Sequence, residues 1–408
     1  MGHASPRRTD LDALRVFACY LLIPFHTAMV FNPAPFYHVR NNELSTLLMI
    51  FCGFVSLWHM PLLFLLAGWS AFASYRIRGV SSFLRERLRR LVVPLVAGCV
   101  LLAPGIKYLE LRSGLDLNFH GLRASEVLQE GFRLVIPNGL PVAPPFHEGF
   151  WRFLPTFYTQ LDRFTWSHLW FLAYLLTFSV IVLPGLALLA RGSRAPSHVS
   201  RAWVYAPILP LVTIQLTLRE HWPGPYNLVA DWANFSFFAT FLIAGIVLAR
   251  VPALENAVVE ERQRSLMIAT AAVALLLLFV LGVLKVPALL LVAIAVAGWC
   301  CVAALLGFMR AHSPRGGPLL DALAESALPV YLLHQPVIVL LGFGVVRLSL
   351  GIAPKFILLL TGSTLVTLAL YWQVRRFAVT RFLSGMRPVA QTVRSYALSP
   401  SPRAALKA

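Results

Sequence analysis

Long runs of apolar residues, separated by short polar segments, dominate the pattern of this sequence. The runs are roughly 18 to 24 residues long, which matches the ~20 helical residues needed to cross a ~30 Å hydrocarbon layer. The pattern therefore predicts an all-α fold, a polytopic transmembrane bundle of about ten helices. We place these helices at residues 12–31, 47–73, 91–109, 168–190, 203–218, 235–250, 266–284, 286–309, 328–347 and 355–374.

Arginine and lysine residues set the expected orientation of the bundle. They are concentrated in alternate connecting segments and in the C-terminal tail. Because cytoplasmic loops carry an excess of Lys and Arg, we expect both the N- and the C-terminus to be cytoplasmic. The distribution is typical of a multi-pass protein of a bacterial-type inner membrane. The first apolar run contains Arg15 and lacks a clear small-residue cleavage site, so we expect it to stay as a helix.

No polar linker long enough to separate domains interrupts the pattern, and no internal repeat is evident. We therefore expect residues 1–385 to form one membrane bundle, followed by a basic, disordered cytoplasmic tail at 386–408. A long outer segment, residues 110–167, follows the third predicted helix and is rich in aromatic side chains. Two interpretations fit it: an aromatic belt in the membrane interface, or a platform on which a sugar stacks.

The composition excludes several classes of protein. The chain is 58% hydrophobic and 13% charged, whereas soluble globular domains are about 25% charged. The net charge of +18 does not indicate a nucleic-acid partner, because the arginines lie between apolar runs without the surface pattern of a nucleic-acid module. The five cysteines lie inside apolar runs and lack metal-ligand spacing, so no metal site is expected. The absence of HExxH and GxSxG motifs argues against zinc and serine hydrolase chemistry.

The first predicted helix carries polar residues that a lipid-facing helix would avoid. Asp12 and Arg15 are three residues apart and can pair on one side of the helix. His26 lies eleven residues beyond Arg15, which brings it back to within about 20° of the same face, roughly 16 Å further along the axis. Charged residues inside membrane helices are costly and usually face the interior. The three residues therefore form a stripe that we interpret as a candidate catalytic site.

Residues 74–94 contain more arginines than topology requires, beginning with Arg76 and Arg78. One interpretation is anchoring of the loop to anionic membrane lipid. The other is a phosphate-binding site, since the guanidinium group binds phosphate oxygens in a bidentate manner. On the second interpretation a large anionic, nucleotide-like ligand would be attracted to this end of the bundle.

Further polar residues lie within or at the ends of other predicted helices. Each histidine among them is, taken singly, better explained as a structural residue that donates to a backbone carbonyl. As a group they are candidates for substrate binding or orientation, and the candidates are His168, Trp170, Glu325 and His334.

These features together resemble the acyltransferase-3 family of integral membrane acyltransferases, and the resemblance extends over essentially the whole chain. The residues that carry it are LDALR at 11–15, His26, FLLAGW at 64–69, Arg76-Ile-Arg78 with the following LRRLVVP, and YLLHQP at 331–336. Within the family, IPFH, SHLWFL, YLLHQP and RFLSGMRPV look most like the glucan-biosynthesis protein C type, which decorates periplasmic glucans.

The resemblance implies a ten-helix enzyme that moves an acyl group from cytoplasmic acyl-CoA to a hydroxyl of an extracytoplasmic carbohydrate. It implies essential roles for Arg15 and His26, and contact of Arg76 and Arg78 with the phosphates of CoA. The donor would be acetyl-CoA or succinyl-CoA, used as a substrate rather than as a permanently bound cofactor. His26 would act as general base on the acceptor hydroxyl, or alternatively carry the acyl group itself.

A polytopic transporter or flippase is the competing interpretation. The same His and Arg stripe would then relay protons or a small or glycan-linked substrate. The absence of an inverted repeat and of paired glycine-broken helices favours the enzyme.

Overall fold

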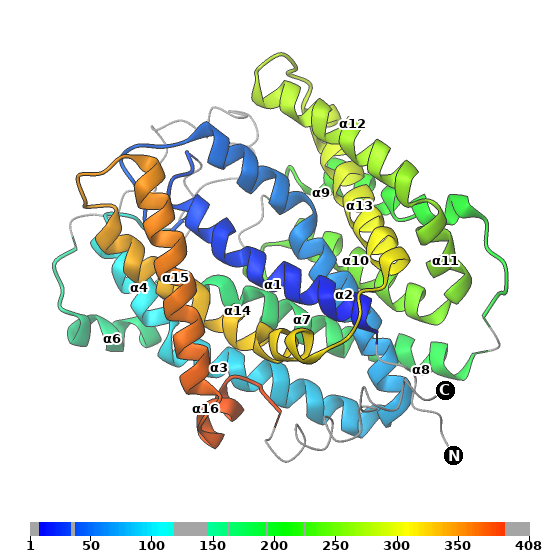
Figure 1. Cartoon of the computed structure of the whole chain (residues 1–408), viewed down its shortest axis with the longest axis horizontal. Helices are drawn as coiled ribbons and strands as arrows, with labels where there is room; N and C mark the ends of the chain where they lie inside the picture. The colour runs from blue at the N-terminus through cyan, green and yellow to red at the C-terminus, as the bar shows by residue number, and fades with distance from the viewer. Residues whose placement is uncertain are drawn as a thin grey trace.

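The computed structural model describes residues 8–33, 37–117, 146–160, 163–192, 195–222 and 226–387, and these contain helices and no strand (Figure 1). The long helices are α1 (Thr9–Met29), α2 (Thr46–Arg87), α10 (Trp232–Arg250), α12 (Arg262–Val280), α13 (Pro287–His312), α14 (Pro318–Val345) and α15 (Ile352–Val374). Shorter ones are α3 (Val93–Leu101), α4 (Ala103–Arg112), α6 (Phe150–Thr159), α7 (Trp170–Ile181), α8 (Leu183–Arg191), α9 (Ile208–Leu218), α11 (Pro252–Glu260) and α16 (Ala378–Leu383). The predicted all-helical membrane bundle is confirmed.

Every one of the ten predicted spans contains helix, but not as ten separate membrane crossings. Seven of the described helical runs are long and apolar enough to cross a membrane, or eight if the bent pair Ser167–Ile181 and Leu183–Arg191 counts as one span. The predicted spans 47–73 and 91–109 fall in one helical run, Thr46–Arg112. The span predicted at 203–218 is only a 3₁₀ turn followed by α9, which has 11 residues.

Breaks inside the helical runs have local causes. The run Thr46–Arg112 turns at Gly79, whose φ of 71° lies in the left-handed region that a residue without Cβ adopts freely. A π-helical segment, Leu88–Val92, then joins α2 to α3. Helices α7 and α8 meet at 48°, with Pro184 in the first turn of α8. Proline has no N–H for the preceding turn, so the bend falls where the helix would otherwise continue.

Glycines allow helices α2 and α10 to approach each other closely. A Cβ on Gly68 of α2 would lie 1.9 Å from the carbonyl oxygen of Leu242 in α10, and one on Gly245 of α10 would lie 2.0 Å from that of Leu65 in α2. The two helices therefore meet backbone to backbone, as small residues permit in membrane proteins. This contact holds α2 in place, and α2 in turn packs on α1.

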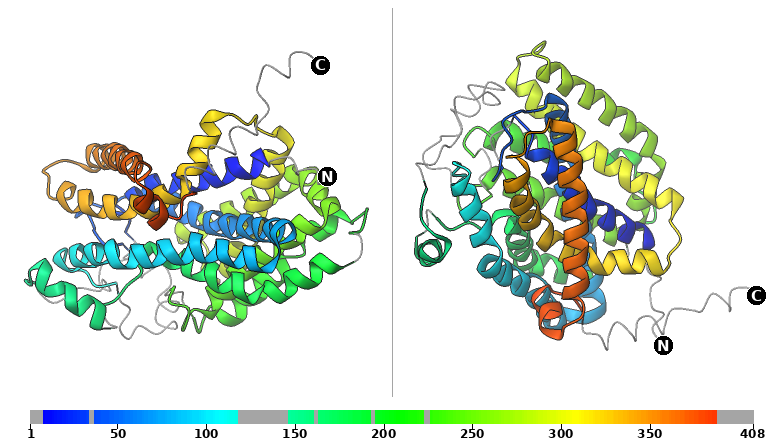
Figure 2. Two further views of the ribbon diagram at one scale, coloured as in Figure 1. Left: turned by 90° about the horizontal axis from the view of Figure 1, so that it is seen from below. Right: turned by 60° about the vertical axis from the view of Figure 1, so that its left-hand side comes forward.

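Around that contact the helices form a bundle with α1 near its centre. Helix α1 packs against both α2 and α14. Helix α15 covers α14 at one edge of the bundle, and α12 covers α13 at another (Figures 1 and 2). The polar residues of α1 are therefore placed inside the bundle rather than against lipid.

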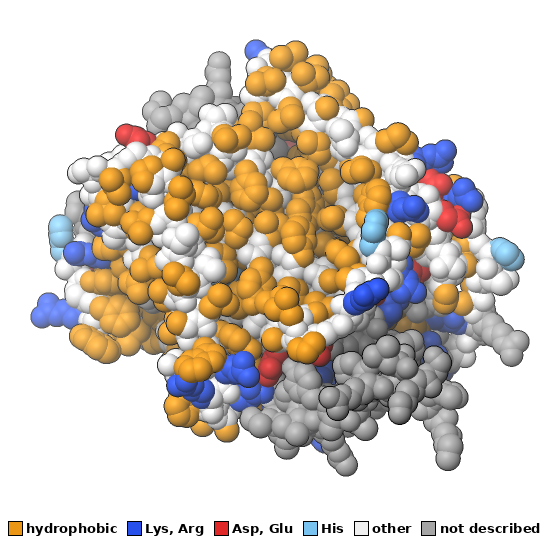
Figure 3. All heavy atoms as spheres, in the orientation of Figure 1, with side chains coloured by type: hydrophobic (Ala, Val, Ile, Leu, Met, Phe, Trp, Pro, Cys, Tyr) orange, Lys and Arg blue, Asp and Glu red, His pale blue; other side chains and the backbone are white. Residues whose placement is uncertain are grey.

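The outside of the bundle is apolar. In Figure 3 hydrophobic side chains cover most of the visible face, and Lys and Arg side chains gather at its margins. Large apolar residues on the outer helices are well exposed, among them Leu365 at 69% and Met267 at 64%. A soluble protein rarely exposes so large a continuous apolar surface. The chain is a multi-pass membrane protein.

The described part of the aromatic outer segment packs against the bundle through α6. Phe153 and Phe157 of α6 are fully buried, and the ring of Phe153 lies 5.7 Å from that of Tyr108 in α4. Trp151, by contrast, is 80% exposed. These buried aromatic side chains hold α6 against α4. Residues 118–145 of the predicted outer segment and 388–408 of the predicted tail lie outside the described residues.

Candidate functional site

The N-terminal part of α1 presents the predicted charged pair. Arg15 donates hydrogen bonds to the Asp12 carboxylate, with an N···O distance of 3.0 Å, and to Ser70 Oγ on α2 at 2.9 Å. The spacing of three residues puts both side chains on one face of the helix, as predicted from the sequence. The Arg15 side chain is about one-third exposed (36%). Its guanidinium group therefore stays open toward the end of the bundle where α1 begins.

Further arginines from residues 76–90 gather at this end, which we call the arginine end. Arg78 forms an ion pair with Glu86, and Arg90 lies 3.6 Å from the same carboxylate. Arg87 is within electrostatic reach of both Arg15 and Arg78. Arg76 lies over the ring of Phe72, 5.8 Å from its centroid. The turn at Gly79 produces this gathering, because it folds residues 80–90 back beside the end of α1 and α2.

Three of the predicted histidines meet in the interior, although they come from distant parts of the chain. The ring of His26 on α1 lies 5.1 Å from that of His334 on α14, between centroids. The ring of His334 lies 5.4 Å from that of His168, in the 3₁₀ turn before α7. His334 and His168 are buried, and His26 is half-buried. We call these three residues the imidazole cluster.

Hydrogen bonds set the tautomers of two of these rings. His334 Nδ1 lies 3.1 Å from the carbonyl oxygen of Val330, and His168 Nε2 lies 3.1 Å from that of Leu332. Since a carbonyl oxygen only accepts, each of these nitrogens carries a proton. The carbonyl of Leu332 lacks the N–H of its usual helical partner because residue 336 is proline.

Three other nitrogens of the cluster are buried and have no hydrogen-bond partner among the described residues. They are His334 Nε2, His168 Nδ1 and His26 Nδ1. A buried polar atom without a partner is uncommon in folded proteins and needs an explanation. In a neutral ring the unbonded nitrogens of His334 and His168 carry lone pairs. The cluster can therefore accept protons from a bound group.

Two predicted substrate-binding residues lie apart from the cluster. Glu325 is nine residues before His334 on α14, about 13.5 Å along the helix axis. Its carboxylate accepts a hydrogen bond of 2.9 Å from Arg381, a buried residue of α16. Glu325 thus fastens the C-terminal segment, and the structure does not bring it to His334.

Trp170, the other such residue, stacks in an aromatic group at the start of α7. Its ring lies 4.3 Å from that of Tyr226 and 5.5 Å from that of Phe238. Tyr174, whose ring lies 5.3 Å from that of Trp170, donates a hydrogen bond to Asp231, the residue just before α10. Burial raises the pKa of Asp231 to about 6, although the hydrogen bond from Tyr174 opposes the shift.

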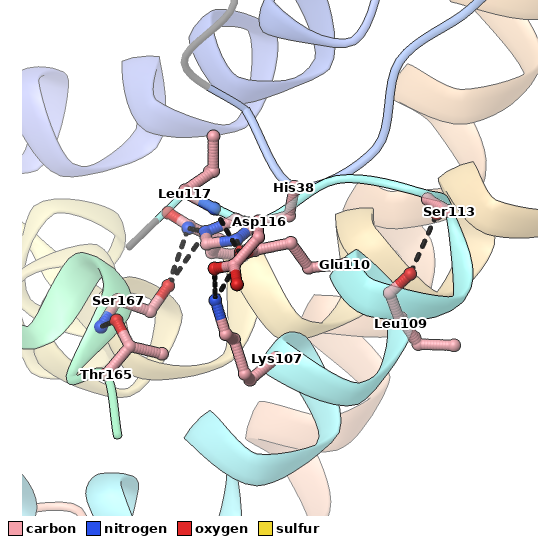
Figure 4. A network of polar contacts seen from close by, with 10 residues as sticks. His38, Lys107, Leu109, Glu110, Ser113, Asp116, Leu117, Thr165 and Ser167 are labelled. Carbon is pink, nitrogen blue, oxygen red and sulfur yellow. Dashed lines mark hydrogen bonds and ion pairs between the residues drawn. The ribbon is translucent and has the colours of Figure 1, made fainter. Parts of the chain in front are cut away.

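Sequence reasoning missed a second polar network, which Figure 4 shows around His38, Glu110 and Ser167. His38, in the loop after α1, places Nδ1 2.5 Å from a Glu110 carboxylate oxygen and Nε2 3.0 Å from Ser167 Oγ. The other Glu110 oxygen accepts from Lys107 Nζ at 2.6 Å. Gln335 places its amide nitrogen 2.8 Å from His38 Nε2 and 2.9 Å from Ser167 Oγ.

The two groups of residues are neighbours in the chain and in space. Ser167 precedes His168, and Gln335 follows His334. The ring of Tyr37, next to His38, stacks on that of His26 at 5.6 Å. One feature of the sequence could have indicated this network. Lys107 and Glu110 are two charged residues, three apart, at the end of a predicted span, where charge is costly.

A polar cavity opens near this network, at the end of the bundle opposite the arginine end. Its volume is about 680 Å³, and the loop after α1 and the loop between α14 and α15 supply most of its lining. Arg40, Arg347 and Lys355 line it, with Glu43 as the acidic member. A much smaller cavity of about 20 Å³ lies beside Arg8. Neither cavity is lined by Arg15 or His26.

Among the described residues no group of three His, Cys, Asp or Glu side chains is arranged to hold a metal ion. A protein-family model described as an acyltransferase domain, Acyl_transf_3, matches residues 8–372. The match includes α1, the arginine end, the imidazole cluster and the network of His38. Neither the search of curated proteins nor that of solved structures found a match.

Proposed function

The chain belongs to the Acyl_transf_3 family of acyltransferases, and on that premise we propose that it carries an acetyl or succinyl group from acyl-CoA to a carbohydrate hydroxyl. The acceptor we propose is an extracytoplasmic carbohydrate such as a periplasmic glucan. The enzyme would lie in a bacterial-type inner membrane with its arginine end in the cytoplasm, as the distribution of Lys and Arg favours.

One observation carries this proposal: a single helix, α1, links the arginine end to the imidazole cluster. Arg15 and His26 are eleven residues apart, about 16 Å along the axis. CoA is a long molecule with phosphates at one end and the reactive thioester at the other. A donor with its phosphates near Arg15 and its arm along α1 would bring the thioester toward His26.

The charge balance of the arginine end supports the donor assignment. Arg15, Arg78, Arg87 and Arg90 lie together, while Asp12 and Glu86 are the acidic partners that they contact. Positive charge is therefore in excess before a ligand binds. Arginine-to-phosphate hydrogen bonds are charge-assisted and directional, so this excess suits the phosphates of CoA.

The opposite end suits the acceptor. The cavity of about 680 Å³ is lined by polar and cationic side chains, including Asn41, Asn42 and Arg40. Amides and guanidinium groups hydrogen-bond to sugar hydroxyls. Val39 and Arg40 of its wall follow His38 directly. An acceptor held there would stand beside the interior polar residues.

In the reaction that we propose, the acceptor hydroxyl attacks the thioester carbonyl and gives its proton to His26. The bond between carbon and sulfur breaks, and the proton ends on the CoA thiol. His334 orients the His26 ring by contact, and His168 packs against His334 from the other side of the cluster. General base catalysis of this kind contributes about 10²–10⁴-fold to the rate.

The test uses purified protein in proteoliposomes with radiolabelled acetyl-CoA or succinyl-CoA and an oligoglucoside as acceptor. His26→Ala should lower transfer by about 10²–10⁴-fold at unchanged protein abundance. His312→Ala is the matched control, because His312 is exposed and its hydrogen bond among the described residues is to Phe308 of its own helix. Equal activity of the His26 variant and the control would remove His26 from the chemistry. Mass spectrometry of envelope glycans with and without the gene would then identify the natural product.

A further inference from the structure

We propose that Ser167 is a nucleophile that carries the acyl group covalently, with His38 as its general base and Glu110 as the residue that positions His38. The inference rests on the proposed acyl-CoA donor and divides the transfer into two steps. Ser167, in place of the acceptor, attacks the thioester, and the acceptor then attacks the acyl-serine ester. The inference assigns a site to residues that the sequence pattern did not single out.

The three side chains form a linear relay. Ser167 Oγ lies 3.0 Å from His38 Nε2, and His38 Nδ1 lies 2.5 Å from Glu110 Oε2 (Figure 4). Nucleophile, imidazole base and carboxylate in this order and at these distances are the arrangement of serine acyl-transfer enzymes. The arrangement is recognised by its geometry, since it occurs on unrelated folds and in different chain orders.

The Glu110 carboxylate is held so that it can fix the tautomer of His38. Glu110 is 1% exposed, and its other oxygen accepts from Lys107 Nζ at 2.6 Å and from the Leu117 N–H at 2.8 Å. These donors keep it ionised and stationary. A carboxylate only accepts, so His38 Nδ1 carries the proton. The lone pair of His38 Nε2 then faces the Ser167 hydroxyl at 3.0 Å and the amide N–H of Gln335 at 2.8 Å.

Ser167 occupies an unusual backbone position. Its φ of 49° lies in the left-handed region, which costs a residue with a Cβ on the order of 1–3 kcal/mol. The residue stands at the start of the 3₁₀ turn that leads into α7. A sharp turn before a helix presents a nucleophile, and the positive end of the helix dipole can stabilise an oxyanion beside it. The amide of Gln335 adds an N–H 2.9 Å from Ser167 Oγ.

A purely structural role explains this network less well. It places His38, Glu110, Lys107 and Gln335 in the interior, each 7% exposed or less. Buried ionic groups are seldom better for stability than apolar residues of the same volume. The network also adjoins the imidazole cluster, because Ser167 and Gln335 are the chain neighbours of His168 and His334. The reacting groups are thus in one place.

The chemistry balances without any further reactant. Ser167 Oγ attacks the thioester carbonyl carbon, a carbon–oxygen bond forms and the carbon–sulfur bond breaks. The Ser167 proton passes to His38 Nε2 and from there to the departing CoA thiolate, which leaves as the thiol. The acceptor hydroxyl then attacks the acyl-serine ester, the bond to Oγ breaks, and the acceptor proton reaches Ser167 Oγ through an imidazole. Serine is regenerated and CoA and the acylated acceptor are the products.

The experiment traps the intermediate by leaving out the acceptor. Purified full-length protein is mixed with acetyl-CoA or succinyl-CoA, CoA thiol release is followed, and the acid-quenched protein is digested and analysed by mass spectrometry. The wild-type protein should release about one CoA per enzyme in a burst and carry an acyl group on the peptide that contains Ser167. Ser167→Gly should lose both, and it should fold well because glycine adopts a positive φ freely.

Two further variants separate chemistry from structure. Ser167→Cys should form a thioester that neutral hydroxylamine cleaves, whereas the serine ester resists it. Ser179→Ala is the matched control: Ser179 lies on α7 and, within the described part of the chain, its hydroxyl donates to the Leu175 carbonyl, so burst and adduct should remain. Glu110→Gln should slow the burst by on the order of 10⁴-fold, and its rate should lose the wild-type pH profile.

The outcomes distinguish this inference from the function that underlies it. If acyl transfer to the oligoglucoside proceeds equally well in the wild type and in Ser167→Gly, the covalent intermediate is refuted and the acyltransferase function stands. An adduct found on His26 instead would also refute it. If the wild type neither releases CoA nor transfers an acyl group from either donor, the proposed donor reaction itself fails.

Discussion

Replacing Gly245 by alanine should loosen the contact between α2 and α10 on which the interior site depends. The added Cβ would lie 2.0 Å from the carbonyl oxygen of Leu65 and 2.8 Å from its carbonyl carbon. Contacts of a Cβ below 3.0 Å essentially do not occur in proteins, and both atoms belong to backbone. A side-chain rotation cannot relieve the clash, so the two helices must separate by about 1 Å.

The magnitude follows from what that separation costs. Overpacking of a close-packed interior costs about 1–3 kcal/mol. The separation also draws Gly68 of α2 away from the carbonyl of Leu242 in α10. Cα–H···O contacts at such helix crossings contribute about 0.5–1 kcal/mol each. Alanine recovers about 0.5–1 kcal/mol because it is the better helix former. The net loss of stability should therefore be about 1–3 kcal/mol.

Thermal unfolding in detergent, followed by circular dichroism or by size-exclusion chromatography after heating, measures the effect. Gly53→Ala is the matched control, since Gly53 lies on α2 and a Cβ there would meet nothing within 4 Å. We expect the control to unfold at the same temperature as the wild type or slightly above it, and Gly245→Ala several degrees below. If the two variants unfold at the same temperature, the reasoning about the helix contact is wrong.

Two further predictions concern the ends of the bundle. Arg76→Gln combined with Arg78→Gln should raise the KM for acyl-CoA by about tenfold or more, because a charge-assisted hydrogen bond contributes about 1.5–3 kcal/mol. In steady-state kinetics the exposed Arg191→Gln serves as control, and an unchanged KM in the double variant would exclude the phosphate role. Asp231 should make the protein less stable as pH rises from about 4 to about 6, since burial raises the pKa of its folded-state carboxyl from 3.8 to about 6 and favours the protonated form. The loss should be at most about 3 kcal/mol, and Asp231→Asn should abolish this dependence in unfolding measurements from about pH 3.5 to about pH 7; a pH dependence unchanged in the variant would contradict the assignment.

Properties that depend on residues close together in the chain were predictable from the sequence. The period of the helix alone places Asp12 and Arg15 together, and the structure contains that ion pair at 3.0 Å. Length and apolar character alone predict each helical span, because a helix satisfies its own backbone hydrogen bonds. The number of crossings was less predictable, since it depends on breaks such as the turn at Gly79 and the bend before α8.

The candidate site shows the limit of such reasoning. His168 and His334 each looked structural when taken singly, and they meet His26 only because α1 packs on α14 and α14 on the turn before α7. Glu325 lies on the same helix as His334 but forms its ion pair with Arg381 of the C-terminal segment, because nine residues of helix separate Glu325 from His334. The position of a residue along a helix does not reveal how deeply its side chain is buried or which side chain it will contact.

What the sequence by itself determined is therefore the membrane bundle, the charged stripe of α1 and the arginine-rich segment at one end, since each follows from local periodicity and composition. The relay of Ser167, His38 and Glu110 was decided by tertiary structure alone. Ser167 is 129 residues from His38, and Glu110 is 72 residues from His38, and no nucleophile motif such as GxSxG surrounds Ser167. Their approach depends on the packing of three separate segments: the loop after α1, helix α4 and the turn before α7. Such contacts are determined by the free energy of the whole fold, which no short stretch of sequence contains.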